Sequence, residues 1–203
     1  MTHHIEYHLS RVTSSPQRLQ NTYGAHRAFW RAYGLTPQTE GAPQPFRFRQ
    51  EPIDSRQKVA FMVQSATKPD WSKVDDVDVQ TKAVRLDLNK ASRFAFRLGA
   101  VVQRRCRSQD GRAITLPVRN PADIERWMHE HAAQAGFDVM QWQFNAPELI
   151  QACVSNGRGF NLNVVRFDGE LQVTDVEAFS KAILHGIGPK PALGMGLLTV
   201  IPL

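Results

Sequence analysis

Stretches in which apolar and polar residues alternate recur along this chain and predict β-strands. In the first half of the chain they are residues 7–13, 46–50, 58–65 and 79–88. Residues 17–33 instead place apolar side chains three and four positions apart, which predicts a helix. Ser15 and Pro16 supply the cap and the first position of that helix, and Gly34 is placed to end it. The aspartate-rich residues 69–78 predict a short acidic turn or helix.

The second half repeats this order of elements without repeating the sequence. Its alternating stretches are residues 93–103, 137–144, 159–167, 170–173 and 197–203. Residues 109–111 (Gln-Asp-Gly) and residues 168–169 (Asp-Gly) each predict a turn, the first of them in a hairpin. A helix is expected over about residues 120–135, with Asn120 as its N-cap. A last helix is expected to begin at Thr174 or Asp175 and to end near residue 185.

Two consecutive β-α-β-β-α-β units account for this order, so we predict an α+β fold of two tandem ferredoxin-like domains. The boundary is expected near residues 89–92, which gives an N-terminal domain of residues 1–90 and a C-terminal domain of residues 91–203. A sandwich of this type leaves one face of its sheet open, as RNA-recognition motifs do. The predicted fold therefore offers a surface to nucleic acid.

The composition is that of a globular protein. Hydrophobic residues make up 42% of the 203 residues and charged residues 22%, so the chain can bury a core of ordinary size. No apolar stretch approaches the roughly 20 residues that span a bilayer, and residues 1–10 lack the apolar core of a signal peptide. Cys106 and Cys153 are too few for a disulfide framework and are expected to be reduced thiols. These features predict a cytoplasmic protein without a membrane partner.

Positive charge is concentrated in one segment. Residues 82–119 hold ten Lys and Arg and two Asp, a net charge of +8, whereas the whole chain has a net charge of +6. Such a concentration is typical of proteins that bind phosphate-rich partners. A solvated face on an alkaline protein explains the same count equally well, so charge alone leaves both interpretations open.

The predicted first helix carries residue types that suit acid–base chemistry. Three- and four-residue spacing places Tyr23 and His26 on one side, with Arg27 and Arg31 on a neighbouring stripe. Histidine titrates near neutral pH, a phenol can orient a proton, and arginine can offset charge on a phosphorane. RNA brings its own nucleophile, the 2′-hydroxyl, so this set needs no metal. Taken alone, the pattern favours a structural histidine on an aromatic core face.

Four glycines and a lysine follow the last predicted helix. They are Gly186, Gly188, Lys190, Gly194 and Gly196. Their spacing is neither that of a dinucleotide fingerprint nor that of a P-loop. A helix C-cap with a tight turn explains one of the glycines but not all four. We therefore expect a loop whose backbone approaches RNA closely and presents amide groups to phosphate.

Further RNA-binding candidates lie in two basic loops. The predicted hairpin turn is flanked by Arg104, Arg105, Arg107 and Arg112, and a hairpin with basic arms fits a nucleic-acid groove. Arg158 lies in a second loop, which also contains glycine. The spacing of His and Cys residues supports no metal site, and the chain has no Gly-x-Ser-x-Gly nucleophile segment. We expect neither a metal nor a cofactor.

Three segments resemble one family, the CasE endoribonucleases of type I-E CRISPR systems. The strongest is residues 186–203 (GIGPKPALGMGLLTVIPL), which is similar to the family's glycine-rich signature and terminal strand. Residues 9–12 (LSRV), followed by the helix with His26, match in order and spacing. Residues 96–98 (FRL) match more loosely. The resemblance covers nearly the whole chain, although about six residues precede the family's usual start.

The resemblance implies tandem ferredoxin-like domains and metal-independent cleavage of CRISPR repeat RNA on the 3′ side of a stem-loop, with a 2′,3′-cyclic phosphate as product. It also implies that the protein keeps the stem-loop and joins other subunits of the Cascade complex. The catalytic histidine and tyrosine of the family fall on His26 and Tyr23, and a groove-binding arginine falls on Arg158. A supporting cation in the helix would here be Arg31.

We therefore predict a metal-independent endoribonuclease of CRISPR antiviral defence. His26 would act as general base or general acid, and Tyr23 would orient the reacting groups. Arg27 or Arg31 would steady the developing charge, while the basic hairpin, Arg158 and the glycine-rich loop would hold the stem. The alternative is a non-catalytic RNA-binding subunit of a ribonucleoprotein, in which His26 is structural. A metal-dependent nuclease is a third hypothesis.

Overall fold

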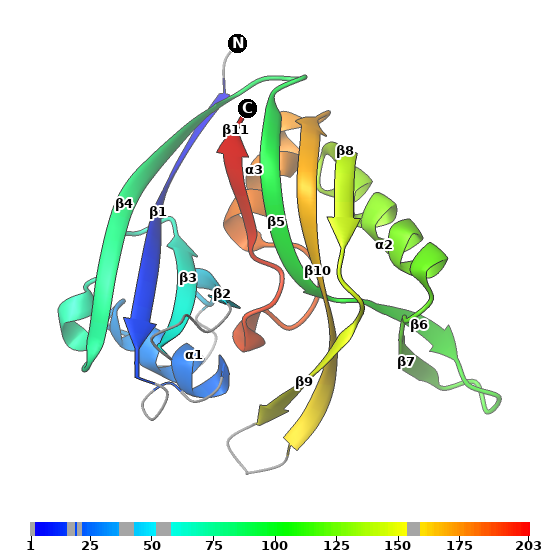
Figure 1. Cartoon of the computed structure of the whole chain (residues 1–203), viewed down its shortest axis with the longest axis horizontal. Helices are drawn as coiled ribbons and strands as arrows, with labels where there is room; N and C mark the ends of the chain where they lie inside the picture. The colour runs from blue at the N-terminus through cyan, green and yellow to red at the C-terminus, as the bar shows by residue number, and fades with distance from the viewer. Residues whose placement is uncertain (1–2, 16–18, 20–21, 37–42, 52–57, 154–158) are drawn as a thin grey trace.

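The computed structural model describes residues 3–15, 19, 22–36, 43–51, 58–153 and 159–203. The first half of the chain forms β1 (His3–Ser14), α1 (Thr22–Arg31), β2 (Phe46–Glu51), β3 (Val59–Ser65), the 3₁₀ helix η1 (Trp71–Lys73) and β4 (Val77–Leu88). The second half forms β5 (Arg93–Val101), β6 (Gln103–Arg107), β7 (Ala113–Pro117), α2 (Pro121–Gln134), β8 (Phe137–Phe144), β9 (Glu148–Cys153), β10 (Gly159–Val173), α3 (Val176–His185), the 3₁₀ helix η2 (Pro191–Leu193) and β11 (Leu198–Pro202). The two halves stand side by side as two sheets (Figure 1).

The first sheet has the strand order β2-β3-β1-β4, and every neighbouring pair is antiparallel. This is the order of a ferredoxin-like unit, with η1 in the place of its second helix. The acidic segment is thus a short helical turn, which Asp70 caps by accepting a hydrogen bond from the Ser72 amide at 3.3 Å. The predicted start of the first helix is wrong, because Leu19 lies in a bend and α1 begins only at Thr22. Pro16, its predicted first position, lies outside the described residues.

The second sheet has the order β11-β5-β10-β8, which repeats the ferredoxin-like order. Antiparallel β6 and β7 form a separate hairpin between β5 and α2, and β9 pairs with the end of β10. Asn120 caps α2 and Asp175 caps α3, as the sequence predicts. The predicted α+β fold of two tandem ferredoxin-like units is confirmed. The division into residues 1–90 and 91–203 stays a prediction; it falls in the turn between β4 and β5.

The turn predicted at residues 168–169 is wrong, and one strand was missed. Residues 168–169 are not a turn, because β10 continues through them from Gly159 to Val173. Gly169 instead lies at an irregularity in the pairing with β8, where a Cβ would collide with the backbone of Gln141 and Trp142. Glycine is needed there for close approach of two strands and not for chain reversal. Strand β9 was not predicted.

Buried residues of both sheets belong to one hydrophobic cluster. Ile5 and Leu86 of the first sheet share this cluster with Phe96 and Phe167 of the second sheet. Two polar side chains of the first sheet reach the last turn of α3: Arg47 Nε donates to the His185 carbonyl at 2.6 Å, and Gln64 Nε2 donates to the Ile183 carbonyl. These bonds satisfy carbonyl groups that a helix leaves unpaired at its C-terminus.

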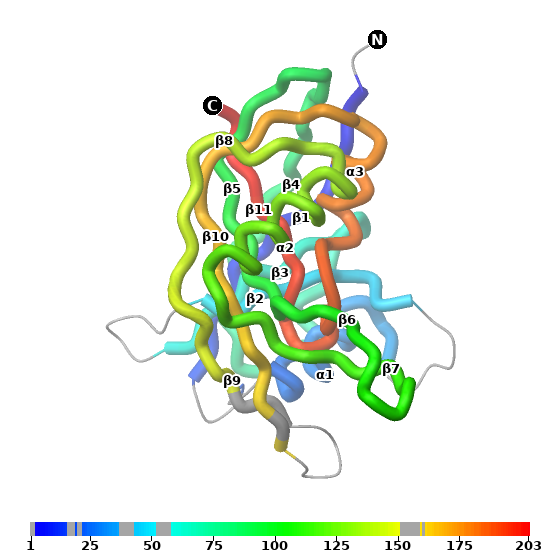
Figure 2. Tube along the Cα trace, turned by 90° about the vertical axis from the view of Figure 1, so that its right-hand side faces the viewer, coloured from blue at the N-terminus to red at the C-terminus, as the bar shows by residue number. Residues whose placement is uncertain are grey.

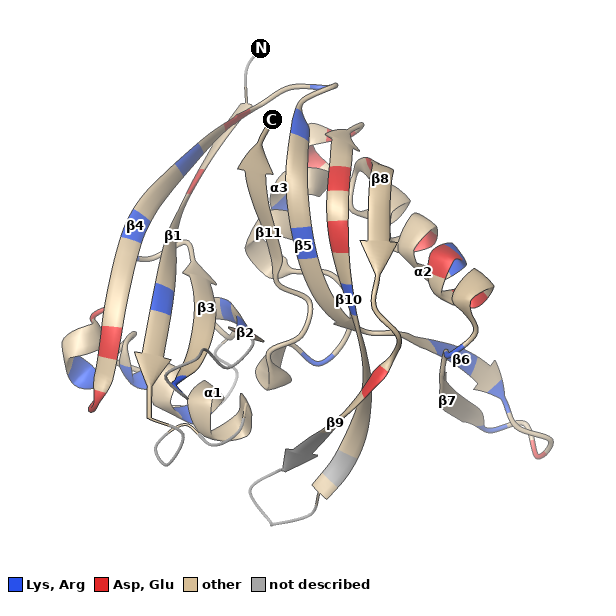
Figure 3. Ribbon diagram, in the orientation of Figure 1, with Lys and Arg blue, Asp and Glu red and all other residues tan. Residues whose placement is uncertain are grey.

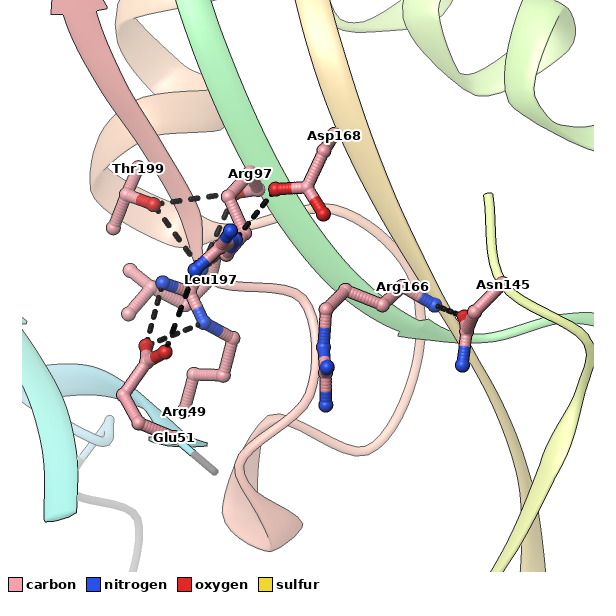
Figure 4. Close-up of polar contacts among 8 residues, drawn as sticks. All are labelled: Arg49, Glu51, Arg97, Asn145, Arg166, Asp168, Leu197 and Thr199. Atoms are coloured by element: carbon pink, nitrogen blue, oxygen red, sulfur yellow. Dashed lines mark hydrogen bonds and ion pairs between the residues drawn. The ribbon is translucent and has the colours of Figure 1, made fainter. Parts of the chain in front are cut away.

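A buried arginine also ties the two sheets together (Figure 4). Arg49 of β2, whose side chain is 8% exposed, pairs with Glu51 at 2.7 Å. It also donates to the carbonyl groups of Arg97 at 3.2 Å and Leu197 at 3.3 Å, and to Thr199 Oγ1 at 3.1 Å. A charge that is this buried is tolerated only when it is paired and hydrogen-bonded.

Candidate functional site

Helix α1 presents His26 to an aromatic cluster formed with β2. The ring of His26 is 5.9 Å from Phe46, 6.3 Å from Phe48 and 6.0 Å from Trp30, measured between ring centroids. The residue is 8% exposed. Tyr23, one helical turn earlier, stacks on the same imidazole at 6.4 Å. The structure therefore brings together the two candidate residues that helical spacing predicted to share a side.

A hydrogen bond from Trp30 fixes the protonation of the imidazole. Trp30 Nε1 lies 3.0 Å from His26 Nε2, and an indole N–H can only donate, so Nε2 is the acceptor and carries no proton. The neutral ring then carries its proton on Nδ1, which is buried and has no hydrogen-bond partner in the described part of the chain. Burial lowers the pKa of His26, and the nearby Gln44 side chain opposes that shift to a smaller extent.

Tyr23 connects the helix to the second half of the molecule. It packs against a small cluster that includes Leu162 and Val164 of β10 and Leu193 and Met195 of the η2 segment. Arg27 and Arg31 are both exposed, on the outer side of α1. The structure thus keeps the two arginines out of the aromatic cluster around His26.

The glycine-rich loop passes between the two halves, and its glycines have positive φ angles of 78° to 86°. The Ile187 amide donates to the Gly196 carbonyl at 2.8 Å, and the Gly196 amide donates to the Gly99 carbonyl at 2.8 Å. A Cβ on Gly194 would lie 3.0 Å from the ring of Phe48, which itself packs on His26. Packing inside the molecule thus explains Gly194 and Gly196, whereas Gly188 is exposed. Contact between this loop and RNA stays a prediction.

The β6–β7 hairpin projects from the sheets with three arginines exposed on one strand, Arg104, Arg105 and Arg107 (Figure 3). Ser108 and Gly111 close its turn with a 2.9 Å backbone bond, as predicted, and Arg112 pairs with Asp110 at 3.3 Å. Arg158 lies outside the described residues. Figures 1 and 2 place α1, β9 and the hairpin at one end of the molecule and the two termini at the other.

A family model described as "CRISPR associated protein" matches residues 5–202. The chain belongs to this family. The resemblance that the sequence suggests is thereby confirmed, over nearly the whole chain.

Two relatives are similar to this chain over more than nine-tenths of its length. The CRISPR-associated endoribonuclease Cse3 of Thermus thermophilus is 28% identical over 198 residues, which is 91% of this chain and 92% of the relative. The CRISPR system Cascade subunit CasE of Escherichia coli is 26% identical over 204 residues, which is 97% of this chain and 100% of the relative.

Solved structures agree with the family assignment. Thermus thermophilus Cse3 bound to an RNA representing a pre-cleavage complex has a TM-score of 0.81 at 26% identity, over 98% of this chain and 100% of that one. The CRISPR-associated protein Cas6e of Escherichia coli has a TM-score of 0.76 at 22% identity, over 97% of this chain and 100% of that one, which shows a shared fold.

Within this family member, part of the basic segment is neutralised by carboxylates from elsewhere in the chain. Arg93 pairs with Glu170 at 2.7 Å, and Arg97 pairs with Asp168 at 2.5 Å. The sequence count of +8 therefore overstates the free charge, because these acids lie outside the segment. Positive charge that is open to a partner is concentrated instead at the hairpin.

Two arginines that were not selected from the sequence line cavities near the hairpin and α1. Arg119 lines a cavity of about 350 Å³ at the base of the hairpin, together with Gln103 and Lys190. Arg166 lines a cavity of about 440 Å³ between α1 and β10. A signal for Arg166 was present, because it is the one charged residue in the run Val164-Val165-Arg166-Phe167 of a predicted strand.

The described residues contain neither a helix long and apolar enough to cross a membrane nor a group of three or more His, Cys, Asp and Glu side chains that could hold a metal ion.

Proposed function

We propose that this chain is the endoribonuclease that cuts CRISPR repeat RNA on the 3′ side of its stem-loop and then remains bound to the stem-loop as a cytoplasmic subunit of Cascade. The observation that carries this proposal is the similarity of 98% of the chain to Cse3 in a pre-cleavage complex with RNA. The exposed arginines of the hairpin, at the same end of the molecule as α1, support it (Figure 1). They supply the backbone contacts on which binding to a stem depends.

The proposed chemistry is attack of a 2′-hydroxyl on the adjacent phosphorus. The new O2′–P bond forms as the P–O5′ bond breaks, which leaves a 2′,3′-cyclic phosphate and a free 5′-hydroxyl. His26 takes the proton of the 2′-hydroxyl, and the imidazolium formed in this way can give it to the departing 5′-oxygen. Tyr23 orients the reacting groups, and Arg27 or Arg31 offsets charge on the phosphorane. No step requires a metal ion.

The lowered pKa of His26 supports the role of base, because at neutral pH the ring enters the reaction with one nitrogen unprotonated. In this structure that nitrogen is Nε2, which accepts the hydrogen bond from Trp30. The bond between the two rings must therefore open when RNA binds.

Incubation of the protein with labelled repeat RNA in EDTA tests the activity. We expect one cut with a cyclic-phosphate end. Cleavage that EDTA stops would support the metal-dependent nuclease instead.

A second test removes the imidazole. His26→Ala should slow cleavage by about 10²- to 10⁴-fold and leave the affinity for the stem-loop nearly unchanged. His26→Asn fills more of the same space and controls for the cavity. Full cleavage by a folded His26 variant would remove this residue from the mechanism.

The near-complete burial of His26 favours one other candidate, a non-catalytic RNA-binding subunit. This candidate predicts RNA that is shifted in a gel but intact after the EDTA incubation. The same assay therefore separates the two functions.

A further inference from the structure

A half-buried arginine, Arg166 of β10, lines the cavity of about 440 Å³ that separates α1 from the second sheet. The walls of this cavity come from both halves of the chain, with Thr22 from α1, Gln50 from β2 and Gly194 from the glycine-rich loop. Figure 4 shows the Arg166 side chain extending apart from the cluster of Arg49 and Glu51. It thus occupies a separate position at the junction of the two sheets.

Strand geometry places Arg166 on the face of β10 that carries part of the cluster next to Tyr23. Leu162 and Val164 belong to the cluster against which Tyr23 packs, and alternate residues of a strand share one face. Arg166 is the next residue on that face, about 7 Å further along the strand. Val164 also lines the cavity. Arg166 therefore lines the cavity from the same strand face that contributes Leu162 and Val164 to the cluster against which Tyr23 packs.

Neighbouring arginines on these sheets have acidic partners. Arg97 pairs with Asp168, the next residue after Arg166 on the same face of β10, and Arg49 pairs with Glu51. No such pair holds the guanidinium of Arg166 among the described residues. Its backbone amide donates to Asn145 Oδ1 at 2.6 Å, but that bond leaves the charge unmatched.

The cavity wall also contains two carboxylates: Glu51, which pairs with Arg49, and Glu148, which forms no ion pair with Arg166 in the described part of the chain. Asn145 Nδ2 donates to Glu148 Oε1 at 2.7 Å. An arginine that is half-buried without an acid loses part of its hydration without compensation. Its five donors in a planar fork are suited to bind a phosphate with two parallel bonds. A guanidinium without an ion pair among the described residues, the polar Thr22 and Gln50 in the wall and the position next to α1 together suit this cavity to an anion.

We propose that this cavity binds a backbone phosphate of the RNA next to the cleaved junction, with the guanidinium of Arg166 as its ligand. The inference rests on the proposed function, because it takes repeat RNA as the substrate and Tyr23 as a neighbour of the reacting groups. It adds a contact that would align the strand at the reaction centre, separate from those that hold the stem. Arg166 is thus a binding residue for the strand and takes no part in proton transfer.

The test uses the full chain and a repeat RNA with a 2′-deoxy sugar at the junction, so that binding is measured without cleavage. Arg166→Gln should raise the Kd about 10- to 100-fold, as expected for loss of a charge-assisted contact. It should also reduce the slope of log K against log salt by about 0.7 to 0.9, the amount for one phosphate. Arg93→Gln, which removes a paired arginine of the same sheet, is the matched control and should change neither quantity.

Neutral methylphosphonate linkages, introduced one at a time around the junction, locate the contact. A methylphosphonate at one of these linkages should weaken RNA binding by the natural protein. The same linkage should cause no further loss of RNA binding by Arg166→Gln. Equal sensitivity of the two proteins at every linkage overturns the proposal, and so does an unchanged Kd and salt slope. Arg166→Met is the second uncharged variant should glutamine impair folding. Absence of cleavage of unmodified RNA by the natural protein would overturn the proposed function instead, and that result is independent of these binding data.

Discussion

The pairing of Trp30 with His26 determines how the imidazole titrates. A proton on Nε2 would break the hydrogen bond from the indole, so the bond and the burial both disfavour the charged ring. The pKa of His26 therefore lies below its usual value of 6.5. In the proposed mechanism, cleavage needs the unprotonated ring, and its rate should fall only in more acidic solution than for an ordinary histidine.

Trp30→Phe should move the acid limb of the pH–rate profile to higher pH. The substitution keeps an aromatic ring against Phe46 and removes the N–H donor together with part of the bulk of the indole, so the pKa of His26 rises toward its usual value. Single-turnover cleavage between pH 5 and 8 measures the shift. Trp71→Phe, which removes an indole bond to Ser10 in the same half, is the control. Identical profiles for natural protein and Trp30→Phe would show that the indole does not position the imidazole.

The same pKa governs stability. The unfolded chain takes up a proton at His26 near pH 6.5, whereas the folded chain does so only at lower pH, so this contribution to stability is present above pH 6.5 and is lost as the pH falls below it. Trp30→Phe should reduce that acid sensitivity. Urea unfolding at pH 7.5 and pH 5.5 gives the difference between the two proteins.

For single residues, helical spacing alone predicted that Tyr23 and His26 lie on the same side of their helix. It could not predict that His26 is nearly buried, because the covering rings Phe46 and Phe48 come from a strand some 20 residues later. Arg166 was missed for the same reason, because its place in the wall of a cavity depends on contacts between distant segments.

Among the elements, the glycine-rich loop should be rigid where it passes between the sheets. Gly196→Ala would place a Cβ 2.5 Å from the Ile187 carbonyl at a φ of 86°. Backbone strain and a steric collision would therefore both destabilise the folded protein. We expect a loss of about 2 to 4 kcal/mol in the free energy of unfolding. Gly111→Ala measures the backbone strain alone, because Gly111 has a φ of 80° but nothing lies within 4 Å of an added Cβ. This variant should lose about 1 kcal/mol in the free energy of unfolding. Equal losses in urea unfolding would contradict this account of the loop.

The β6–β7 hairpin should contribute to RNA binding through its charge alone. Replacement of Arg104, Arg105 and Arg107 by Gln should reduce the slope of log K against log salt by about 2 to 3, at about 0.7 to 0.9 per phosphate contact. The thermal midpoint should stay unchanged, because all three side chains are exposed. Arg112→Gln should have a smaller effect, since Asp110 already pairs with Arg112. A triple variant with an unchanged salt slope would exclude the hairpin from the RNA interface.

Alternation and capping signals predicted most elements, and one of the exceptions has a clear tertiary cause. The Asp-Gly pair at residues 168–169 has the composition of a turn, yet both residues lie within β10. Asp168 is used there to pair with Arg97, and Gly169 allows β8 to approach. Tertiary contacts thus override a local turn signal, and a single sequence does not reveal them.

For the molecule as a whole, Arg49 should contribute more to the free energy of unfolding than any exposed charged residue does. Arg49→Met leaves Glu51 half-buried without its nearest partner, and we expect a loss of about 3 to 5 kcal/mol in the free energy of unfolding. A double variant with Glu51→Met should recover part of that loss, because no uncompensated charge remains. Urea unfolding of the two single variants and the double variant measures this coupling, and strictly additive losses would contradict it.

The turn at residues 89–92 is the sole covalent link between two sheets that are also joined by Arg47, Gln64 and Arg49. A protease that nicks this exposed turn would thus leave both fragments associated. Separately expressed fragments should reassemble as a heterodimer, with an activity that depends on their concentration.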